Sequence, residues 1–425
     1  MKTTALRLYG KNDVRLESFE LPQIREDELL VRIICDSLCM SSYKAVVKGT
    51  DHKRVPADIA VNPTVIGHEF CGEIVEVGEK WRQKYTSGQR FVIQPGMKET
   101  FYAIGYSYPY MGGNMTYGIV PAIVIEGGYV LPYDGEAFFS GALAEPLSCV
   151  TGAVHANYHT IHGDYTHIMG IKPGGRAAAL AAAGPMGLAL LDYMIHRDER
   201  PSLLVCTDID GERLARAERI LSPAEAGKQG VELVYMNTAG NTDPVGALRA
   251  LTGGEGYDDV FVFAPVSAVI EQGDAILAYD GCLNFFAGPE KEDFSAPFNF
   301  YDVHYNASHI AGTSGGNTDD MIESLELASA GRTNPAILVT HVGGLDSAAE
   351  ATLNMPAIGG GKKLIYTHIS MPLTAIADFG RLGGSDPLFA ELGGIMERNG
   401  GLWSAEAERC LLENGKAFAP ENGKF

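Results

Sequence analysis

The sequence predicts an α/β protein in two parts, a strand-rich first part and a second part built on a doubly wound parallel sheet. Residues 1–150 contain short apolar runs separated by Gly and Pro turns, such as ELLVRIICDS and GEIVEVG, a texture typical of strands. From about residue 174, apolar runs alternate with helical patterns, as in SLLVCTDID followed by GERLARAERIL. Strands that are apolar throughout and alternate with helices indicate a parallel sheet covered on both faces. The length of 425 residues also favours two domains over one core.

Composition excludes several classes of protein. The formal charge of −20 disfavours nucleic acid or an anionic membrane as a partner. Seven scattered cysteines imply no disulfide framework. No apolar run has membrane-spanning length, and the N-terminal MKTTALRLYGKNDVRLESF resembles strand-turn-strand rather than a signal peptide. We therefore expect a cytoplasmic protein whose ligands are small molecules, with a local basic pocket if a ligand is anionic.

A dinucleotide site is predicted where the first strand of the parallel sheet meets its helix. The stretch AAAGPMGLALLDYMIH supplies Ala182-x-Gly184-x-x-Gly187, small residues that let backbone amides approach a pyrophosphate. The next strand ends in Asp208, where a carboxylate can bind both adenosine ribose hydroxyls. The alternative is that the glycines only permit tight strand–helix packing and that Asp208 caps a helix. The order of the elements favours a Rossmann dinucleotide-binding domain.

A metal site is predicted in the strand-rich part. The stretch NPTVIGHEFCGEIVEVGEK carries His68 and Glu69 side by side, and Cys39 and Glu145 lie in SLCMSSYKAVVKG and LAEPLSCV. One thiolate, one imidazole, one carboxylate and water form an open tetrahedral zinc site of the catalytic kind. Taken singly, each residue has another explanation, since Cys39 resembles a small buried hydrophobe and Glu145 an acid at a helix start.

Several motifs together resemble one known family. GHEFCGEIVEVG, KYTSGQRF, GGNMTYGIVP, AEPLSCV, KPGGRAAALAAAGPMG and GGKKLIY occur in the order found in zinc-dependent medium-chain alcohol and polyol dehydrogenases. Stretches such as GYSYPYMGGN and FNFYDVHYNASHIAGTSGG are most similar to the bacterial L-sorbose-1-phosphate reductase branch. The resemblance implies a GroES-like catalytic domain over residues 1–155, completed by about 346–425, and a Rossmann domain over 156–345. It also implies a dimer or tetramer.

The resemblance assigns roles to particular residues. Cys39, His68 and Glu69 would hold one catalytic Zn²⁺, and Glu145 would be an alternate ligand or bind through the water of the metal. Ser41 would pass on the proton of the substrate hydroxyl. The implied cofactor-binding residues are Ala182, Gly184, Pro185, Met186, Gly187, Asp208, Arg213 and Thr313. The cofactor would be NAD(H), because a carboxylate at the ribose repels a 2′-phosphate; the nearby Arg213 leaves NADP(H) open. Thr313 lies in GTSGG, expected near the nicotinamide unless it only forms a turn.

The chain departs from the family pattern in three places. The acid that often supports the zinc histidine is replaced by Ser42, so another group must orient His68. Residues 94–113 contain no cysteine, which predicts one metal ion per chain and no second, structural zinc. The residues after about 370 look helical and have no assigned role; we expect packing on the catalytic domain or a subunit contact.

The proposed substrate is a ketose phosphate or polyol phosphate, specifically L-sorbose 1-phosphate and D-glucitol 6-phosphate. Its phosphate needs cations near the metal, and Lys44, Lys53 and Arg54 follow Cys39 in SSYKAVVKGTDHKRVP. Lys44 lies where relatives often carry a relay histidine, so it could serve either task. A dehydrogenase of unphosphorylated polyols is the alternative. A zinc-free enone or quinone reductase would lack the Cys39, His68 and Glu69 set, and a non-catalytic dinucleotide-binding protein would not need to keep it.

Overall fold

The computed structural model describes residues 1–419, so the last six residues of the predicted helical tail lie outside the described residues. The chain divides into two units, residues 1–145 with 338–425 and residues 146–337. The expected boundaries at 155 and 345 therefore lie slightly later than the observed division. Within the described part of the chain, no helix is long and apolar enough to cross a membrane.

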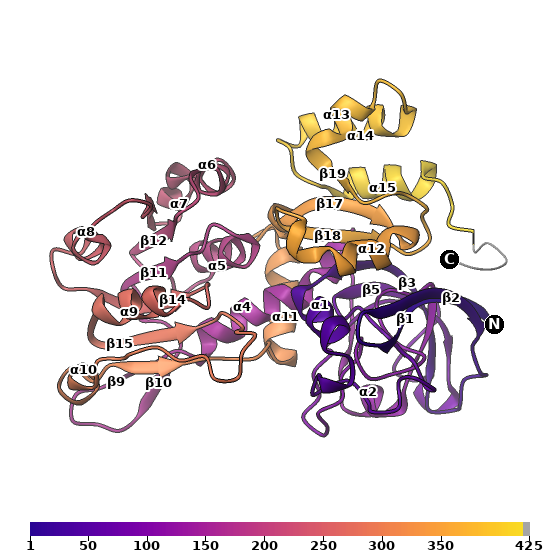
Figure 1. Cartoon of the computed structure of the whole chain (residues 1–425), viewed down its shortest axis with the longest axis horizontal. Coiled ribbons are helices and arrows are strands. Elements are labelled where there is room, and N and C mark those ends of the chain that lie inside the picture. Colours follow the sequence, from indigo (N-terminus) through magenta and orange to yellow (C-terminus); the bar gives the residue numbers. More distant parts are fainter. Residues whose placement is uncertain (420–425) are drawn as a thin grey trace. The chain divides into compact units, whose positions relative to one another are not determined.

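Unit 1 is built from two sheets (Figure 1). The larger has the order β19-β17-β18-β3-β5-β6-β8, with β7 also paired to β3, and the smaller has the order β2-β1-β4. The strands of unit 1 are β1 Lys2–Gly10, β2 Asp13–Glu20, β3 Leu29–Leu38, β4 Thr64–Val65, β5 Phe70–Val77, β6 Arg90–Ile93, β7 Tyr117–Val120, β8 Val130–Pro132, β17 Val339–Gly344, β18 Lys362–Tyr366 and β19 Thr374–Ala375. Its helices are α1 Met40–Lys48, α2 Ala122–Glu126, α3 Phe138–Ala142, α12 Ala348–Leu353, α13 Phe379–Leu382, α14 Pro387–Arg398 and α15 Ala405–Asn414.

The late strands β17, β18 and β19 join the N-terminal strands because β18 pairs antiparallel with β3. This pairing brings the predicted GGKKLIY strand beside the segment that ends just before Cys39. Apolar side chains from both ends of the chain, such as Leu8, Val46 and Ile365, share one buried cluster. The strand-rich unit is therefore completed by C-terminal residues.

The C-terminal helices pack on unit 1, which confirms the packing alternative for the extension. Trp403 is buried, and its indole Nε1 donates to the Tyr366 hydroxyl over 2.9 Å. The buried Glu408 carboxylate on α15 accepts from the backbone N–H groups of Phe138 (2.6 Å) and Phe139 (2.8 Å) and from the Tyr366 hydroxyl (2.7 Å). A buried carboxylate that is not hydrogen-bonded would be costly, so these contacts fix α15 against α3 and β18.

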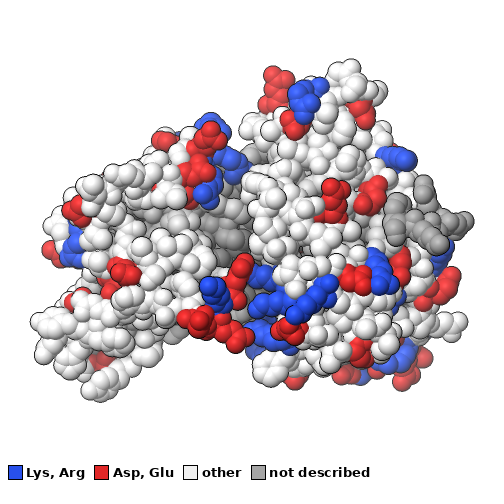
Figure 2. Space-filling model, viewed as in Figure 1, with Lys and Arg blue, Asp and Glu red and all other residues white. Residues whose placement is uncertain are grey.

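The visible surface of unit 1 is mixed in charge, with one basic region. Figure 2 shows Lys and Arg side chains gathered around α1, although the whole chain carries a formal charge of −20. This region follows Cys39 in the chain, where the sequence predicted cations for a substrate phosphate.

Unit 2 is a six-stranded parallel sheet with the order β13-β12-β11-β14-β15-β16. Its strands are β11 Arg176–Leu180, β12 Leu203–Asp208, β13 Glu232–Asn237, β14 Tyr257–Val262, β15 Leu277–Phe285 and β16 His309–Ala311, beside the hairpin β9 Tyr158–Thr160 and β10 His167–Met169. The helices are α4 Ala144–Ala156, which begins at the division, α5 Pro185–His196, α6 Gly211–Ile220, α7 Pro223–Lys228, α8 Pro244–Leu251, α9 Ser267–Ala275, α10 Phe300–Tyr305 and α11 Thr318–Ser329.

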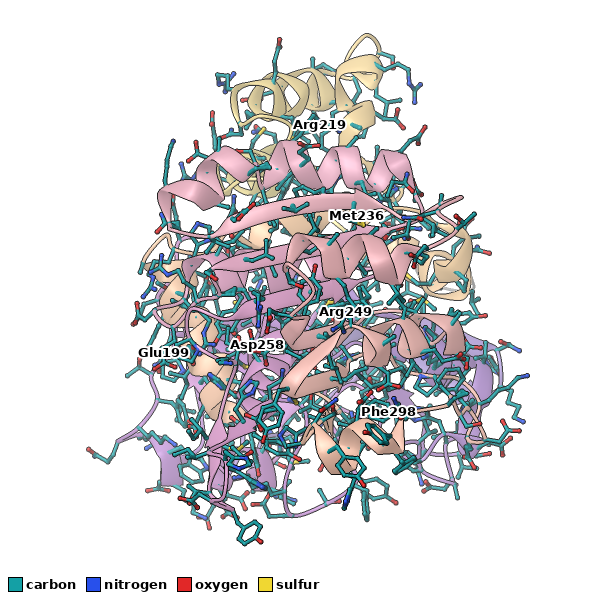
Figure 3. The ribbon with its side chains drawn as sticks, turned by 90° about the vertical axis from the view of Figure 1, so that its left-hand side faces the viewer. Glu199, Arg219, Met236, Arg249, Asp258 and Phe298 are labelled. Atoms are coloured by element: carbon teal, nitrogen blue, oxygen red, sulfur yellow. The ribbon has the colours of Figure 1, made fainter. Side chains whose placement is uncertain are left out.

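This strand order confirms the Rossmann prediction. In chain order the sheet reads 3-2-1-4-5-6, so the order reverses between β11 and β14, where doubly wound folds bind dinucleotides. Seen from the side, helices cover the sheet, with Arg249 on α8 and Met236 on β13 (Figure 3). Met236 packs against the apolar cluster that contains Val205 and Val260. The alternation of strand and helix was thus sufficient to predict the architecture of unit 2.

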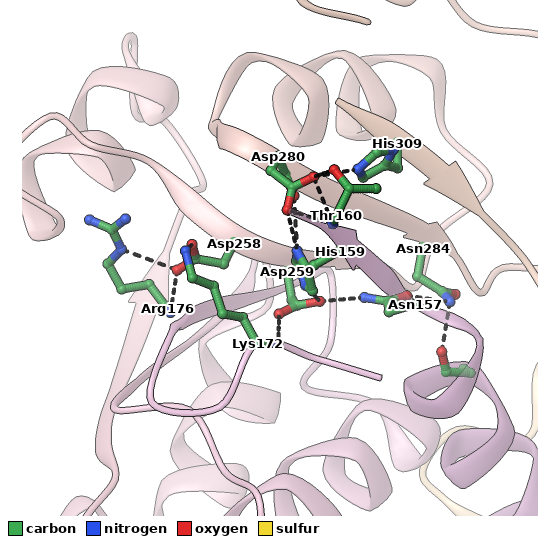
Figure 4. Close-up of polar contacts among 11 residues, drawn as sticks. Asn157, His159, Thr160, Lys172, Arg176, Asp258, Asp259, Asp280, Asn284 and His309 are labelled. Carbon is green, nitrogen blue, oxygen red and sulfur yellow. Dashed lines mark hydrogen bonds and ion pairs between the residues drawn. The ribbon is translucent and has the colours of Figure 1, made fainter. Parts of the chain in front are cut away.

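A buried polar network fastens the β9 strand to the sheet of unit 2 (Figure 4). The Asp259 carboxylate accepts from Asn157 Nδ2 over 2.7 Å and from the Lys172 backbone N–H over 2.9 Å, and it lies 3.2 Å from His159 Nε2. The Asp280 carboxylate accepts from the backbone N–H and the hydroxyl of Thr160. Every carboxylate oxygen of these two aspartates has a partner, which is the expected condition of a structural network.

Candidate active site

The predicted metal-binding residues converge in unit 1. One ligand atom each of Cys39, His68 and Glu69 lies within 4.8 Å of the others, and His68 and Glu69 are buried. Cys39 precedes α1 in extended backbone, and the other two lie just before β5. The donors come from two separate loops, as an open catalytic zinc site requires. The thiol, imidazole and carboxylate set fits zinc, and the metal would act there as a Lewis acid.

Protonation in the metal-free chain is consistent with this ligand set. Burial, with the neighbouring charge of Glu69, raises the pKa of the Cys39 thiol to about 12. Burial lowers the pKa of His68 to about 4, so its imidazole is neutral and keeps a lone pair for a metal. A cation at the site would stabilise the thiolate, because metal binding displaces the thiol proton.

Ser42 takes the place of the missing acid behind His68. Its hydroxyl lies 3.2 Å from His68 Nδ1, and Ser42 is itself buried. A second partner on the far nitrogen fixes the tautomer and the ring orientation of a metal-binding histidine. The sequence showed that the acid was absent, and the structure identifies its replacement one residue after Ser41.

Lys362 also belongs to the candidate metal site, although the sequence did not indicate it. Its ammonium group donates to both carboxylate oxygens of Glu69, at 2.5 and 2.7 Å. Although burial alone would raise it, the pKa of the Glu69 carboxyl is lowered by the charge of Lys362. Two adjacent lysines in an otherwise apolar strand, GGKKLIY, were the available signal, because one of them must point inward.

Tyr106 is a second residue of the candidate metal site that the sequence did not indicate. It is 2% exposed, and its hydroxyl lies 3.3 Å from His68 Nε2. The hydroxyl also forms a side-chain hydrogen bond with Ser41. Tyr106 belongs to the segment 94–113, and neither the lack of cysteine there nor the stretch GYSYPYMGGN singles out this tyrosine.

Glu145 lies in the first turn of α4. Its charge raises the pKa of the thiol of Cys39 and of the hydroxyl of Tyr106, in both cases as a smaller contribution than burial. The carboxylate is therefore electrostatically coupled to the metal-binding cluster. The position at a helix start is observed, and the role of Glu145 at the metal stays a prediction.

The three basic residues predicted to bind a phosphate do not all lie in one place. Lys53 and Arg54 line the same pocket of about 120 Å³ with Thr100 and Tyr102. The Arg54 guanidinium lies over the Tyr106 ring, 5.4 Å from its centroid. Lys44 lies half-buried on α1 and is not among the residues that line this pocket.

His52 lies in a region of positive potential. Its ring stacks on the Tyr106 ring, with the two centroids 5.6 Å apart. Burial lowers the pKa of His52 to about 4, with the charges of Arg54, Lys48 and Lys53 adding to the shift. Within the described residues, neither Lys53 nor Arg54 has a carboxylate partner in an ion pair. Cations without an acidic partner beside a metal-binding cluster are suited to an anionic group of a ligand.

The sequence left open whether the glycines of the turn between β11 and α5 serve packing or dinucleotide binding. The structure distinguishes Gly187 from Gly184 in this respect. A Cβ on Gly187 would lie 1.9 Å from the backbone oxygen of Ala182, so Gly187 is required by strand–helix packing. A Cβ on Gly184 would meet no atom within 4 Å, so packing does not explain this glycine. Gly184 caps α5, with Pro185 and Met186 as the first helical residues, and open space at a helix N-terminus fits a pyrophosphate.

The other predicted cofactor residues also lie at the carboxyl edge of the sheet. Asp208 ends β12, and one of its oxygens accepts from the Ala183 backbone N–H over 3.2 Å. Arg213 pairs with Asp208 and Asp210 at 3.5 and 3.0 Å. The Thr313 hydroxyl, shortly after β16, is buried with no hydrogen-bond partner within the described chain. An unpaired buried hydroxyl at this edge fits a polar ligand group.

Comparison with known proteins agrees with this geometry. Residues 25–145 match the alcohol dehydrogenase GroES-like domain, and residues 203–330 match the zinc-binding dehydrogenase family. The chain is 52% identical to mannitol-1-phosphate 5-dehydrogenase of Aliivibrio fischeri, over 97% of this chain and 98% of the relative. It is 48% identical to L-sorbose 1-phosphate reductase of Klebsiella pneumoniae, again over 97% and 98%.

Solved structures support the same fold. The 2R,3R-butanediol dehydrogenase of Bacillus subtilis superposes with a TM-score of 0.69, covering 86% of this chain and 99% of that one at 22% identity. Each unit of the chain matches its own family model, and the full-length relatives are close in sequence. The chain therefore belongs to the zinc-dependent alcohol and polyol dehydrogenases of the medium-chain family, NAD(P)-linked enzymes that act on alcohol groups.

Proposed function

We propose that this protein interconverts a ketose phosphate and a polyol phosphate with NAD(H), with L-sorbose 1-phosphate and D-glucitol 6-phosphate as the preferred pair. The observation that carries the proposal is the basic pocket of Lys53 and Arg54 beside Tyr106, whose hydroxyl is 3.3 Å from His68. The named relatives support the substrate class, since one is called a mannitol-1-phosphate 5-dehydrogenase and another an L-sorbose 1-phosphate reductase.

Electrostatics explains why a phosphate needs this pocket. A protein with a charge of −20 repels a dianion at long range, so binding depends on local cations that carry no competing carboxylate. Lys53 and Arg54 meet this condition, and the charges of Lys48, Lys53 and Arg54 together lower the pKa of His52, beyond the larger effect of burial. Lys44 on α1 is proposed as a further cation or as part of the proton relay.

The reacting carbon would be held near Cys39, His68 and Glu69, with Glu145 available as an alternate ligand or as a partner of bound water. When bound, zinc polarises the carbonyl of the ketose or the hydroxyl of the polyol. Ser41 is proposed to carry the hydroxyl proton outward. Asp208 is proposed to bind the adenosine ribose and to favour NAD(H) over NADP(H), because its carboxylate repels a 2′-phosphate.

A substrate panel tests the proposal. Ketoses and polyols, free and phosphorylated, are assayed with NADH and NADPH in the reductive direction and with NAD⁺ and NADP⁺ in the oxidative direction. We expect kcat/KM for the phosphorylated sugar to exceed that for the free sugar by at least about a hundredfold, mainly through KM, in line with two charge-assisted contacts of about 1.5–3 kcal/mol each.

Variants test which residues cause the preference for the phosphorylated sugar. Arg54→Ala and Lys53→Ala should each reduce it by about tenfold or more and leave turnover of a free polyol nearly unchanged. Lys84→Ala removes one exposed charge of the same unit, over the Tyr85 ring, and should have no such effect. Equal efficiency of the wild-type protein on free and phosphorylated sugars would leave a dehydrogenase of unphosphorylated polyols in place of this proposal.

A further inference from the structure

The corner of the chain that carries His68 and Glu69 is held by a separate, glycine-rich segment. The Gly113 backbone N–H donates to the Gly67 oxygen over 2.7 Å, and the Asn114 backbone N–H donates to the Ile66 oxygen over 3.0 Å. Both acceptors belong to the two residues that immediately precede His68. The peptide groups that lead into the metal-binding corner are therefore bound by residues 113 and 114.

The side chain of Asn114 extends this contact to the strand that leads to Cys39. Its Nδ2 donates to Asp36 Oδ2 over 3.0 Å, and the same nitrogen lies 3.4 Å from the Ile66 oxygen. Asn114 and Asp36 are both fully buried, and Asp36 lies on β3, which ends directly before Cys39. One amide group thus connects the two segments that supply the candidate metal ligands.

Two glycines allow the Asp36–Asn114 pair to pack directly against the corner. Gly67 has a φ of +98°, and a Cβ there would lie 2.5 Å from Asn114 Nδ2 and 2.9 Å from Asp36 Oδ2. A Cβ on Gly113 would lie 1.8 Å from Asp36 Oδ1. Because no larger residue fits at either position, any movement of the pair is transmitted to the backbone of Gly67.

A buried amide and carboxylate are a costly choice in a core, because each polar group needs a partner there. Two apolar side chains of similar size would fill the same space without that cost. We propose that Asp36 and Asn114 are positioning residues, which hold the backbone before His68 so that His68 and Glu69 face Cys39. Ligands that are already in place lose less conformational freedom when they bind a metal.

The inference rests on the assignment of Cys39, His68 and Glu69 as the metal ligands, which is part of the proposed function, and not on the choice of substrate. Asp36 and Asn114 are not members of the ligand set. Their effect passes through hydrogen bonds to the backbone of residues 66–67 and requires no proton transfer.

Asn114→Leu removes the amide group at similar volume. We expect the dissociation constant for zinc to rise by about tenfold or more, the lower range for loss of an outer partner of a metal ligand. The visible absorption spectrum of the cobalt-substituted protein should also change, because it reports the geometry of the ligands. Competition with a chromogenic chelator measures the zinc affinity, so neither readout depends on turnover.

A double variant separates positioning from stability. Asn114→Leu alone leaves the Asp36 carboxylate buried without this donor, which lowers stability for that reason alone. Asp36→Leu/Asn114→Leu removes both polar groups, so most of the lost Tm should return. Zinc binding should remain about tenfold weaker than in the wild type, because residues 113–114 are no longer tied to β3. Recovery of wild-type zinc affinity together with the Tm would overturn the inference.

Two further variants serve as the conservative change and the control. Asp36→Asn keeps an oxygen acceptor for Asn114 Nδ2, so its zinc affinity should stay within about threefold of the wild type, less than one ordinary hydrogen bond is worth. Thr116→Val deletes a buried hydroxyl of the same segment, which lies 3.1 Å from Thr3 Oγ1 on β1. This control should lower the Tm and leave zinc affinity and the cobalt spectrum unchanged.

Crystal structures of the wild-type protein with and without zinc test the inference even if the leucine variants do not fold. The backbone of residues 66–69 should be the same in both, and a corner that rearranges when zinc binds would overturn the positioning role. Cys39→Ser identifies a different failure. Zinc that stays bound in this variant contradicts the ligand assignment, whereas Cys39-dependent zinc that Asn114→Leu binds as tightly as the wild type overturns only the positioning role.

Discussion

Two buried clusters that contain acids and histidines differ in what surrounds their electron-pair donors. In unit 2, the Asp259 and Asp280 carboxylates accept from backbone and side-chain donors on β9 and beyond (Figure 4). In unit 1, Cys39, His68 and Glu69 bring electron-pair donors together within 4.8 Å. A carboxylate that accepts hydrogen bonds from several elements holds those elements together. Where the lone pairs of several side chains point toward one place, a cation is needed to stabilise them.

Lys362 gives the metal-binding cluster of unit 1 one structural contact of the kind found in unit 2. It is a buried cation that pairs with Glu69, so the metal-binding cluster carries one structural ion pair of its own. The pairing holds the Glu69 carboxylate in its charged form without a metal. Within the described residues, Cys39 and His68 form no equivalent ion pair, so they are the part of the cluster that depends most on a metal.

The largest expected effect is that of Cys39→Ser. Loss of an outer partner of a ligand already costs about 10–100-fold in metal affinity or activity, so loss of a ligand should cost more than about a hundredfold in both. Dinucleotide binding should persist, because the residues proposed for it lie in unit 2. Zinc content, turnover and cofactor fluorescence titration check these points. Cys149→Ala, at a thiol outside the cluster, is the matched control, and a Cys39→Ser protein that keeps its zinc and activity would show the ligand assignment to be wrong.

The next effect is that of Lys362→Met, which leaves Glu69 buried without its cation. Removing one partner of a buried pair costs about 3–5 kcal/mol, so the free energy of unfolding of unit 1 in the metal-free protein should fall by about that amount. Bound zinc should recover part of the loss by neutralising the carboxylate. Denaturant unfolding with and without zinc measures both. An unchanged stability in the metal-free state would mean that the pair contributes nothing there.

Asp259→Asn tests the structural cluster of unit 2. The amide group presents N–H donors to Asn157 Nδ2 or to the Lys172 backbone N–H, so at least one buried donor loses its acceptor. The expected cost is about 1–3 kcal/mol of stability, with zinc content unchanged. Glu232→Gln, on an exposed position of β13, is the control. Loss of zinc in Asp259→Asn would contradict the separation of the two clusters.

The smallest effect is a pH dependence at His155. Hydrogen bonds to Asp320 and Glu323 raise the pKa of His155 from 6.5 to about 9. Because the folded value exceeds the unfolded one, the stabilisation is fully present below about pH 6.5 and is lost as the pH rises through about 9. The side chain is 39% exposed, so solvent screening keeps the effect below about 1 kcal/mol. The Tm of His155→Gln should be lower than that of wild type at pH 6 and equal to it near pH 10; a difference that persists at pH 10 would exclude this cause.

Local patterns predicted much of the fold and part of the site. Apolar strands alternating with helices predicted the parallel sheet, and the run GGKKLIY predicted β18. His68 and Glu69 are adjacent in the chain, and Cys39 opens a helix, so each was visible as a motif. Gly187 and Gly184 look alike in sequence, and only the surrounding atoms show that the first is needed for packing and the second is not.

Contacts between distant segments could not be predicted in the same way. Lys362 is 293 residues from Glu69, and the pair depends on the register in which β18 lies along β3. Tyr106 lies in a loop-rich segment without periodicity, so no pattern indicated which of its tyrosines points inward. The packing of Trp403 and Glu408 on Tyr366 likewise depends on tertiary contacts between helices and a strand.

We expect Cys39, His68 and Glu69 to hold the one zinc ion that this chain binds. Elemental analysis of the purified protein, with anomalous diffraction at the zinc edge to place the ion, tests it most directly. The expected result is one zinc per chain, bonded to the Cys39 thiolate and the His68 imidazole, with no second zinc in residues 94–113. An absence of zinc, two ions per chain, or an ion bound away from Cys39 and His68 would contradict it.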